Sequence, residues 1–317
     1  MKLTAGYAWR KTAEQSAIFV ILVILVVIAA VASPVFLKER NIYNVVLQAS
    51  MLGIVATGQL FVILTGGIDL SVASVIAFMS ILSAGLMNGR NELVYPVALA
   101  CLGISLVIGL ANGLLVTKLR IPAFIATLGM VLIVQGIRFI YSGGMPKGSI
   151  PDGLLFFGRA SLLWIPLAVW ICLAVGALSA VILQRMTLGR SIYAAGGNMR
   201  TAYMSGINTD RVQIIAYMLS SFWAGFTGLL LTGWVGMADN WLGRGYDLNS
   251  IAAVVIGGAV MTGGKGNVWG TLAGACMIAL LFNFVVLLGL DADAQRIVRG
   301  LVIIGAVGLY VRMSARA

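Results

Sequence analysis

Histidine is absent from this chain of 317 residues, and cysteine is scarce. Without histidine, the chain has no imidazole to serve as a general acid or base or as a metal ligand. The three cysteines, Cys101, Cys172 and Cys276, are isolated in apolar segments, so they form neither a C-x-x-C motif nor an even-numbered disulfide framework. We therefore interpret them as small buried hydrophobic residues.

Charge is the second deficit of this sequence. Only 10% of the residues are charged and 61% are hydrophobic, whereas a soluble domain has about 25% charged and about 45–50% apolar residues. Lipid must therefore be the main solvent of the chain. The formal net charge is +11, but long uncharged runs separate the basic residues, which excludes the continuous basic face of a nucleic-acid-binding protein.

Uncharged runs of about 20 residues, the length of a membrane-spanning helix, recur along the whole chain. They predict an all-α polytopic membrane protein with about ten transmembrane helices in a single transmembrane domain, residues 1–317. The spans are expected at residues 16–34, 42–64, 72–88, 93–117, 122–141, 162–183, 212–235, 249–261, 268–290 and 297–311. The third and eighth spans are short and abut glycine-rich breaks, so we expect broken helices there.

The distribution of basic residues predicts the orientation of these spans. With the amino terminus inside, twelve basic residues fall in cytoplasmic segments, namely Lys2, Arg10, Lys11, Lys118, Arg120, Arg185, Arg190, Arg200, Arg211, Lys265, Arg312 and Arg316. Seven fall outside, namely Lys38, Arg40, Arg90, Lys147, Arg159, Arg244 and Arg296. This excess favours cytoplasmic N and C termini. Arg138, near the outer end of its span, is expected to extend outward to water.

A competing interpretation concerns the amino terminus. Lys2, Arg10 and Lys11, the apolar run that follows and the small residues 30–32 imitate a secretory signal peptide with its cleavage site. Because the rest of the chain is itself polytopic, we favour a retained first span.

Two glycine-rich breaks share the sequence Thr-Gly-Gly, at residues 65–67 and at residues 262–264. At the first break, Asp69 or Ser71 is expected to cap the helix that follows. The alternative is a gate or pathway element, because irregular backbone at membrane depth survives only inside protein or beside a wet cavity. The second break lacks the spacing of a phosphate-binding loop, so we interpret it as a tight cytoplasmic turn. The shared triplet is also consistent with an internal repeat.

The largest polar cytoplasmic segment covers residues 184–211. Residues 199–204 predict about one turn of helix between two glycine breaks, too short to be stable alone. Docking against a partner would stabilise it; the alternative is an ordinary basic loop. Outside, residues 141–161 and 235–248 form the longest loops, and the aromatic and charged residues of the second suit the docking of a soluble protein or an aromatic belt.

Five motifs in order carry a family resemblance. They are Thr65–Ser71, Ala111–Leu115 with Ile121–Gly129, Gly189–Asn198, Ser205–Ile207, and Gly245–Leu248 leading to Gly263–Gly266. With them the chain resembles, over nearly its whole length, the ribose/galactose-type permeases of ATP-binding-cassette (ABC) sugar importers, in the branched-chain amino acid/sugar permease superfamily. Ala73, Asp247, Asn249 and Ser250 depart from the usual family pattern, which leaves the identity of the sugar open.

The resemblance implies a permease of the bacterial inner membrane that pairs with a second permease subunit, either a copy or a related chain. It further implies a periplasmic sugar-binding protein that delivers a monosaccharide and a separate cytoplasmic ATPase that hydrolyses ATP, so that this chain binds no cofactor and is not an enzyme. The family's coupling loop, which docks into the ATPase, maps onto Gly189, Arg190, Ala195, Gly196, Gly197, Asn198, Ser205, Gly206 and Ile207. Its glycines are expected to allow close approach to the partner.

Polar residues within the spans are the candidates for the substrate path. We predict this role for Gln48, Gln59, Asp69, Ser71, Asn112, Thr127 and Gln135, although hydrogen bonding between helices is an equally good interpretation of each. No metal site is expected. The main rival function is an ion-coupled secondary transporter of a small polar solute, which would place carboxylates within its spans; only Asp69 is near such a position.

Overall fold

The computed structural model describes residues 33–291 without interruption, with residues 20, 22–24 and 26–31 before them and residues 293–295, 297–298, 300–301 and 304–305 after them. Within these residues the chain is helical apart from turns and one two-stranded hairpin, β1 (Ser161–Leu162) and β2 (Ile165–Pro166). The main helices are α2 (Glu39–Leu64), α3 (Val72–Met87), α4 (Val94–Thr117), α5 (Ala123–Ser142), α6 (Asp152–Arg159), α7 (Leu167–Arg185), α8 (Thr187–Gly197), α9 (Met199–Met204), α10 (Thr209–Val235), α11 (Tyr246–Ile256) and α12 (Val268–Leu287). The predicted all-α membrane class is confirmed.

Six helices among the described residues are long and apolar enough to cross a membrane: α2, α4 with the 3-10 turn Asn91–Leu93 before it, α5, α7, α10 and α12. The helices α3 and α11 are apolar but shorter, as the sequence predicts for the segments beside the two glycine breaks. Most of the predicted tenth span and part of the predicted first span lie outside the described residues, as do Lys2, Arg10, Lys11, Arg312 and Arg316. Within the first span, Leu22–Val31 is a short apolar helix.

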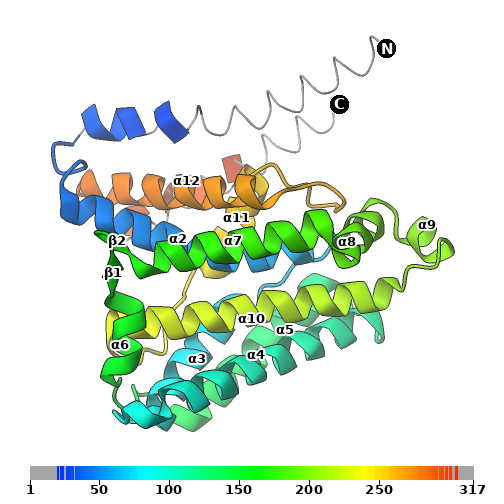
Figure 1. Cartoon of the computed structure of the whole chain (residues 1–317), viewed down its shortest axis with the longest axis horizontal. Coiled ribbons are helices and arrows are strands. Elements are labelled where there is room, and N and C mark those ends of the chain that lie inside the picture. Colours follow the sequence, from blue (N-terminus) through cyan, green and yellow to red (C-terminus); the bar gives the residue numbers. More distant parts are fainter. Residues whose placement is uncertain are drawn as a thin grey trace.

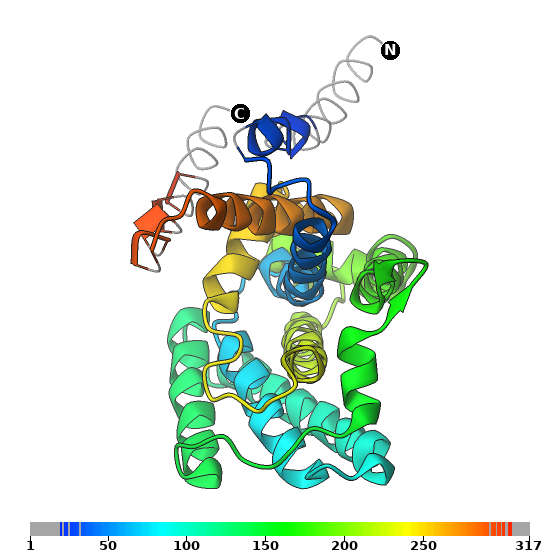
Figure 2. The ribbon, with the colours of Figure 1, turned by 90° about the vertical axis from the view of Figure 1, so that its left-hand side faces the viewer.

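The helix α10 lies in the middle of the molecule. It packs against α2 on one side and against α3 and α4 on the other, so that α2, α7 and α12 form one layer and α3, α4 and α5 form the opposite layer (Figures 1 and 2). Small residues let the α4 and α10 backbones approach: a Cβ on Gly113 would lie 2.7 Å from the Cα of Ile214. Close backbone packing of this kind is the usual basis of helix association in lipid.

Two predicted boundaries are wrong. The predicted sixth span begins at residue 162, but residues 161–166 form the hairpin and α7 begins only at Leu167. Pro166 precedes this helix, and proline disfavours the helical conformation in the residue before it. The predicted eighth span, 249–261, is displaced in the structure to Tyr246–Ile256, since the chain turns at Gly257 and Gly258, with Gly258 at φ +88°.

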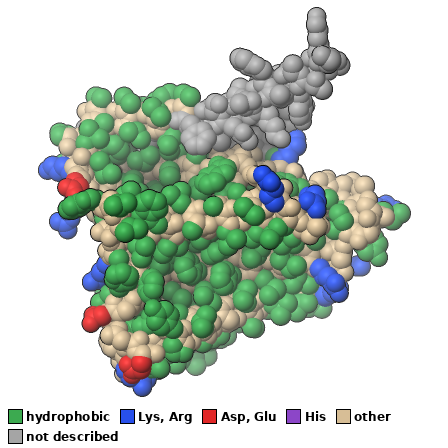
Figure 3. All heavy atoms as spheres, in the orientation of Figure 1, with side chains coloured by type: hydrophobic (Ala, Val, Ile, Leu, Met, Phe, Trp, Pro, Cys, Tyr) green, Lys and Arg blue, Asp and Glu red, His purple; other side chains and the backbone are tan. Residues whose placement is uncertain are grey.

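On the face shown in Figure 3, apolar side chains cover the middle of the molecule and most charged side chains lie towards its two ends. Large exposed hydrophobic residues are numerous on α4, α5 and α7, including Leu99, Leu132 and Leu178. At one end lie α8 and α9, and at the opposite end lie α6 and the hairpin (Figure 1). This arrangement fits a protein whose long helices run between two aqueous phases.

Candidate functional site

The break between α2 and α3 holds a fully buried carboxylate, that of Asp69. Its Oδ1 accepts hydrogen bonds from the backbone N–H of Ser71 at 2.9 Å and from the Ser71 hydroxyl at 2.6 Å. Its Oδ2 accepts from the Ser220 hydroxyl of α10 at 2.8 Å. A charged group removed from water needs such donors, because an unpaired buried charge is strongly unfavourable. The site is therefore built to hold the carboxylate in place.

Four helices fix the backbone around this carboxylate. From α2, the Gln59 amide pairs with both the N–H and the carbonyl of Asp69, at 3.1 and 3.0 Å, with its oxygen and nitrogen assigned to suit these partners. From α4, Asn112 donates to the Ser71 hydroxyl at 2.9 Å. The hydroxyls of Thr127 on α5 and Tyr217 on α10 lie 3.4 Å from the carbonyl oxygen of residue 68. The irregular segment is thus tied to four helices, α2, α4, α5 and α10.

The structure brings together five of the seven predicted path residues, Gln59, Asp69, Ser71, Asn112 and Thr127. Gln48 is exposed on α2, and Gln135 is half-buried farther along α5, so neither belongs to this network. The predicted role of all seven in the substrate path stays a prediction. Their hydrogen bonds to one another correspond to the other interpretation, polar links between helices.

Of the two residues expected to cap α3, only Asp69 accepts a backbone N–H at the start of the helix. Ser71 occupies the N-cap position of α3 but its side chain makes no capping bond. Its hydroxyl donates to Asp69 instead, and Asp69 accepts the Ser71 N–H. The contributions of Tyr217 and Ser220 are absent from the sequence prediction, because these residues are some 150 positions away and no spacing rule connects them to Asp69.

The two Thr-Gly-Gly breaks meet at the α8–α9 end of the molecule. The N–H of Gly264 donates to the carbonyl oxygen of Leu64, the last residue of α2, at 2.9 Å. A Cβ on Gly263 would lie 2.9 Å from the backbone nitrogen of Gly66. Gly196 of α8 packs into the same junction, where a Cβ would overlap the Leu64 oxygen and lie 2.5 Å from the Gly264 nitrogen. Three distant segments therefore share one contact that depends on the absence of side chains.

The segment 184–211, hereafter the coupling segment, has a buried part and an exposed part. Gly189 and Ala195 are buried and Gly196 is half-buried, while Ile207 is half-buried near the start of α10. The predicted turn of helix is confirmed as α9, which is capped by the Asn198 side chain accepting from the N–H of residue 201 at 2.9 Å. The exposed members of the predicted set are Arg190, Gly197, Asn198, Ser205 and Gly206.

Some of the glycines that were expected to allow close approach to a partner instead make close contacts within the chain itself. Gly196 meets Leu64 and Gly264, whereas a Cβ on Gly197 or Gly206 would meet nothing within 4 Å among the described residues. Tyr193 adds a second link between α8 and the second break, because its hydroxyl donates to the Gly266 carbonyl at 2.8 Å. Burial raises the pKa of this phenol above its usual value, so it remains a neutral donor at physiological pH.

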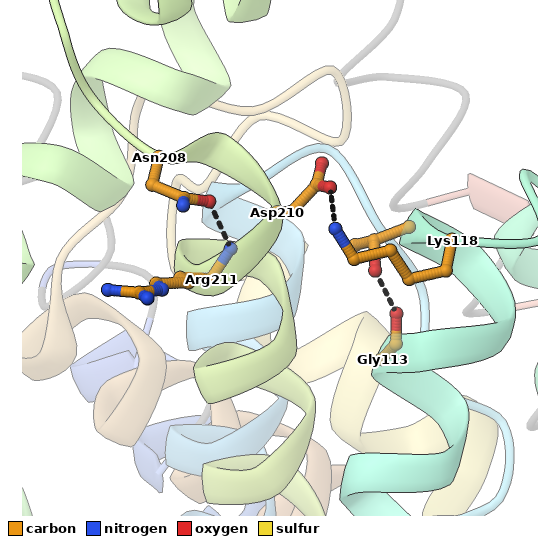
Figure 4. Close-up of polar contacts among 6 residues, drawn as sticks. Gly113, Lys118, Asn208, Asp210 and Arg211 are labelled. Carbon is orange, nitrogen blue, oxygen red and sulfur yellow. Dashed lines mark hydrogen bonds and ion pairs between the residues drawn. The ribbon is translucent and has the colours of Figure 1, made fainter.

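An ion pair joins the ends of α4 and α10 beside the coupling segment. Lys118 Nζ lies 2.6 Å from Asp210 Oδ2, and both side chains are substantially exposed (Figure 4). In the same turn, Asn208 Oδ1 accepts from the backbone N–H of Arg211 at 3.0 Å and caps α10 (Figure 4). An exposed pair contributes little stability, but it fixes where the coupling segment joins the helix core.

The opposite end of the molecule carries the loop that follows α10, residues 236–245, here called the aromatic loop. Arg159 of α6 donates from Nε to the Trp234 carbonyl and from Nη2 to the Val235 carbonyl, both at 3.0 Å. The rings of Trp241 and Phe139 form an edge-to-face pair with centroids 6.1 Å apart, and the guanidinium of Arg244 lies 5.6 Å from the Trp241 centroid. The loop is therefore anchored on the helices beneath it.

Comparison with known proteins places these features in a family. A family model described as "Branched-chain amino acid transport system / permease component" matches residues 41–307. The chain belongs to this permease family. The match spans the break at Asp69, the coupling segment and the aromatic loop, and the family resemblance seen in the sequence motifs is confirmed.

Several curated permeases are similar over nearly the full length of the chain. The ribose import permease protein of Escherichia coli K12 is 38% identical over 298 residues, which cover 93% of this permease and 92% of that protein. The ribose import permease protein of Bacillus subtilis is 38% identical over 301 residues, with 94% and 92% covered. An autoinducer 2 import system permease protein of Salmonella typhi is 33% identical over 295 residues, with 93% and 84% covered. No solved structure gives a significant match.

Proposed function

We propose that this permease is the membrane subunit of an ABC importer and carries a monosaccharide across the bacterial inner membrane. The observation that carries the proposal is 38% identity to ribose import permeases along more than nine-tenths of the chain. The coverage includes both the buried helix junction and the exposed coupling segment. D-ribose is accordingly the first sugar to test.

In this function the coupling segment docks into a separate cytoplasmic ATPase. Support comes from α9, where Met199, Tyr203 and Met204 expose 42%, 68% and 80% of their surface at the tip of the molecule. Exposed apolar side chains on so short a helix fit a protein interface. A movement of α8 would be transmitted directly to the two glycine-rich breaks, because Gly196 and Tyr193 of this helix contact them.

The same proposal includes the topology of the chain in the membrane and its protein partners. Ten membrane segments, both termini in the cytoplasm and one domain over residues 1–317 fit the basic residues at the α8–α9 end, which include Lys118, Arg190 and Arg200. A second permease subunit completes the path, and a periplasmic sugar-binding protein docks at the end that carries α6 and the aromatic loop. ATP is hydrolysed on the partner, and this chain performs no catalysis.

Affinity purification of the tagged permease from detergent-solubilised membranes of its host tests the proposal. A stoichiometric ABC ATPase should copurify, and the substitution Met204→Glu should remove it while Glu92→Gln, at the other end of the molecule, should not. If the permease comes out alone and is active in uptake driven by an ion gradient, it is a secondary transporter and the proposal is wrong.

A further inference from the structure

Arg138 lies inside the protein and does not extend outward as the sequence analysis predicts. Only 4% of its surface is exposed, and it shares the buried face of α5 with Val134 and Met130. Among the described residues, its Nε–H has no hydrogen-bond partner. A buried guanidinium with a free donor is costly unless an acceptor reaches it for at least part of the working cycle.

A second free donor approaches from a different element. The aromatic loop, residues 236–245, hereafter the external plug, connects α10 to α11 and lies against both α3 and α5. Asn240 of the plug is 3% exposed, and its Oδ1 lies 3.4 Å from the hydroxyl of Ser142, one helical turn after Arg138. The Nδ2 of Asn240 has no partner among the described residues.

The plug is fitted closely against both helices. A Cβ on Gly243 would lie 2.5 Å from the side chain of Ile76 on α3, and Trp241 packs edge-to-face on Phe139 of α5. The carboxylate of Asp239 interacts electrostatically with Arg138, although these two described side chains form no direct ion pair. The plug thus places the Asp239 carboxylate and the free Asn240 donor close to the part of α5 that holds Arg138, whose guanidinium lies 5.1 Å from the centroid of the Phe139 ring.

We propose that Arg138, Asn240 and Asp239 form a binding station for a neutral, hydroxyl-rich solute at the outer end of the transport path. The inference rests on the proposed import function and adds the residues that contact the solute. Hydroxyl groups both accept and donate, so they satisfy the free donors of Arg138 and Asn240 together with the Asp239 carboxylate. The opposite charges of Arg138 and Asp239 offset one another, so the station carries no net charge that would favour an ionic solute over a neutral one. Because the station is buried here, the plug must move when the solute enters.

Uptake of radiolabelled D-ribose tests the station in proteoliposomes that contain the permease, its ATPase and its binding protein. Arg138→Gln and Asn240→Ala should each lower the uptake rate by about tenfold or more, the usual effect of losing a hydrogen bond to a charged or buried partner. Arg138→Lys, which keeps a charged donor, should lose less. ATP hydrolysis stimulated by the binding protein should stay within about twofold of the wild type. Arg90→Gln, an exposed arginine at the same end, is the matched control.

Normal uptake by Asn240→Ala would overturn the station. A parallel loss of uptake and ATP hydrolysis would overturn it too, because that result indicates a structural role. A wild type that imports neither D-ribose nor any other neutral monosaccharide would instead refute the proposed sugar import.

A second measurement uses the permease alone and so separates the two proposals. With the three native cysteines replaced by alanine, Ser142→Cys is alkylated with an impermeant maleimide. Excess D-ribose should slow this reaction several-fold, inorganic phosphate at equal concentration should not, and Arg138→Gln should abolish the protection. Absence of protection by D-ribose and by every other neutral monosaccharide tested, or equal protection by phosphate, would overturn the station.

Discussion

At the residue scale, the helix junction depends on a few residues that are held by partners from other helices. Ser71 and Ser220 stabilise Asp69 by hydrogen bonds. Leu64 and Gly264 approach Gly196 so closely that no side chain fits at this position. Each of these residues acts through partners from other helices. Substitutions at these positions should therefore affect the whole helix junction, more than any local element.

Replacing Asp69 tests whether its carboxylate is a structural link. Asp69→Ala leaves the buried Ser71 and Ser220 donors without acceptors, so the free energy of unfolding should fall by about 3 kcal/mol. Asp69→Asn keeps one acceptor oxygen and should lose less. Thermal unfolding of the purified permease in detergent measures both, with the exposed Asp152→Asn as control; equal stability of Asp69→Ala and the wild type would contradict the link.

Gly196 and Gly197 are adjacent residues in different environments. Gly196→Ala places a methyl group against the Leu64 carbonyl and should destabilise the junction by about 1–3 kcal/mol, whereas a methyl group on Gly197 meets nothing within 4 Å. The thermal midpoints of the two variants in detergent compare them directly. If the midpoint falls equally for both, the open space beside Gly197 is not real.

At the element scale, the coupling segment combines a fixed base with a free tip. Its base is held by the Tyr193–Gly266 hydrogen bond and by the junction at Gly196, while α9 projects beyond the helix core. The length of α9 was predictable from the glycines that flank it. The contact of α8 with both breaks was not, because no local pattern records which loops meet.

A bulky residue at Gly197 tests the tip as a docking element. Gly197→Trp should leave the permease folded and in the membrane, since the site is open within the chain, yet it should block sugar uptake and the ATPase contact. Uptake in cells and the amount of copurified ATPase are the measurements, and Glu92→Trp, at an exposed position at the other end of the molecule, is a control for bulk. Full uptake by Gly197→Trp would remove this surface from the ATPase interface.

At the scale of the whole molecule, the long helices run between a basic end and an aromatic end. α10 lies between two layers of helices, so motion at the coupling segment and motion at the external plug act on opposite ends of the same element. A rigid central helix of this kind suits transport in which access alternates between the two sides.

Single cysteines at positions 147 and 200 test the orientation. In a cysteine-free background, Lys147→Cys should react with an impermeant maleimide added to intact spheroplasts, and Arg200→Cys should react only in inverted vesicles. Both positions are exposed, so permeabilised membranes should label both and serve as the control. The reverse pattern would place α8 and α9 outside and exclude a cytoplasmic ATPase at that end.

The sequence alone determined the membrane class, the positions of most helices, the two broken segments and the family, because hydropathy, glycine breaks and motifs are local properties of the chain. Only the tertiary structure decided which segments meet: Ser220 with Asp69, Gly196 with Leu64, and Asn240 with the segment that holds Arg138. In a membrane protein the lipid-facing and protein-facing sides of a helix are both apolar, so periodicity gives little information on its rotation. The burial of Arg138 was therefore decided by the packing of α5 against its neighbours and could not be predicted from the sequence.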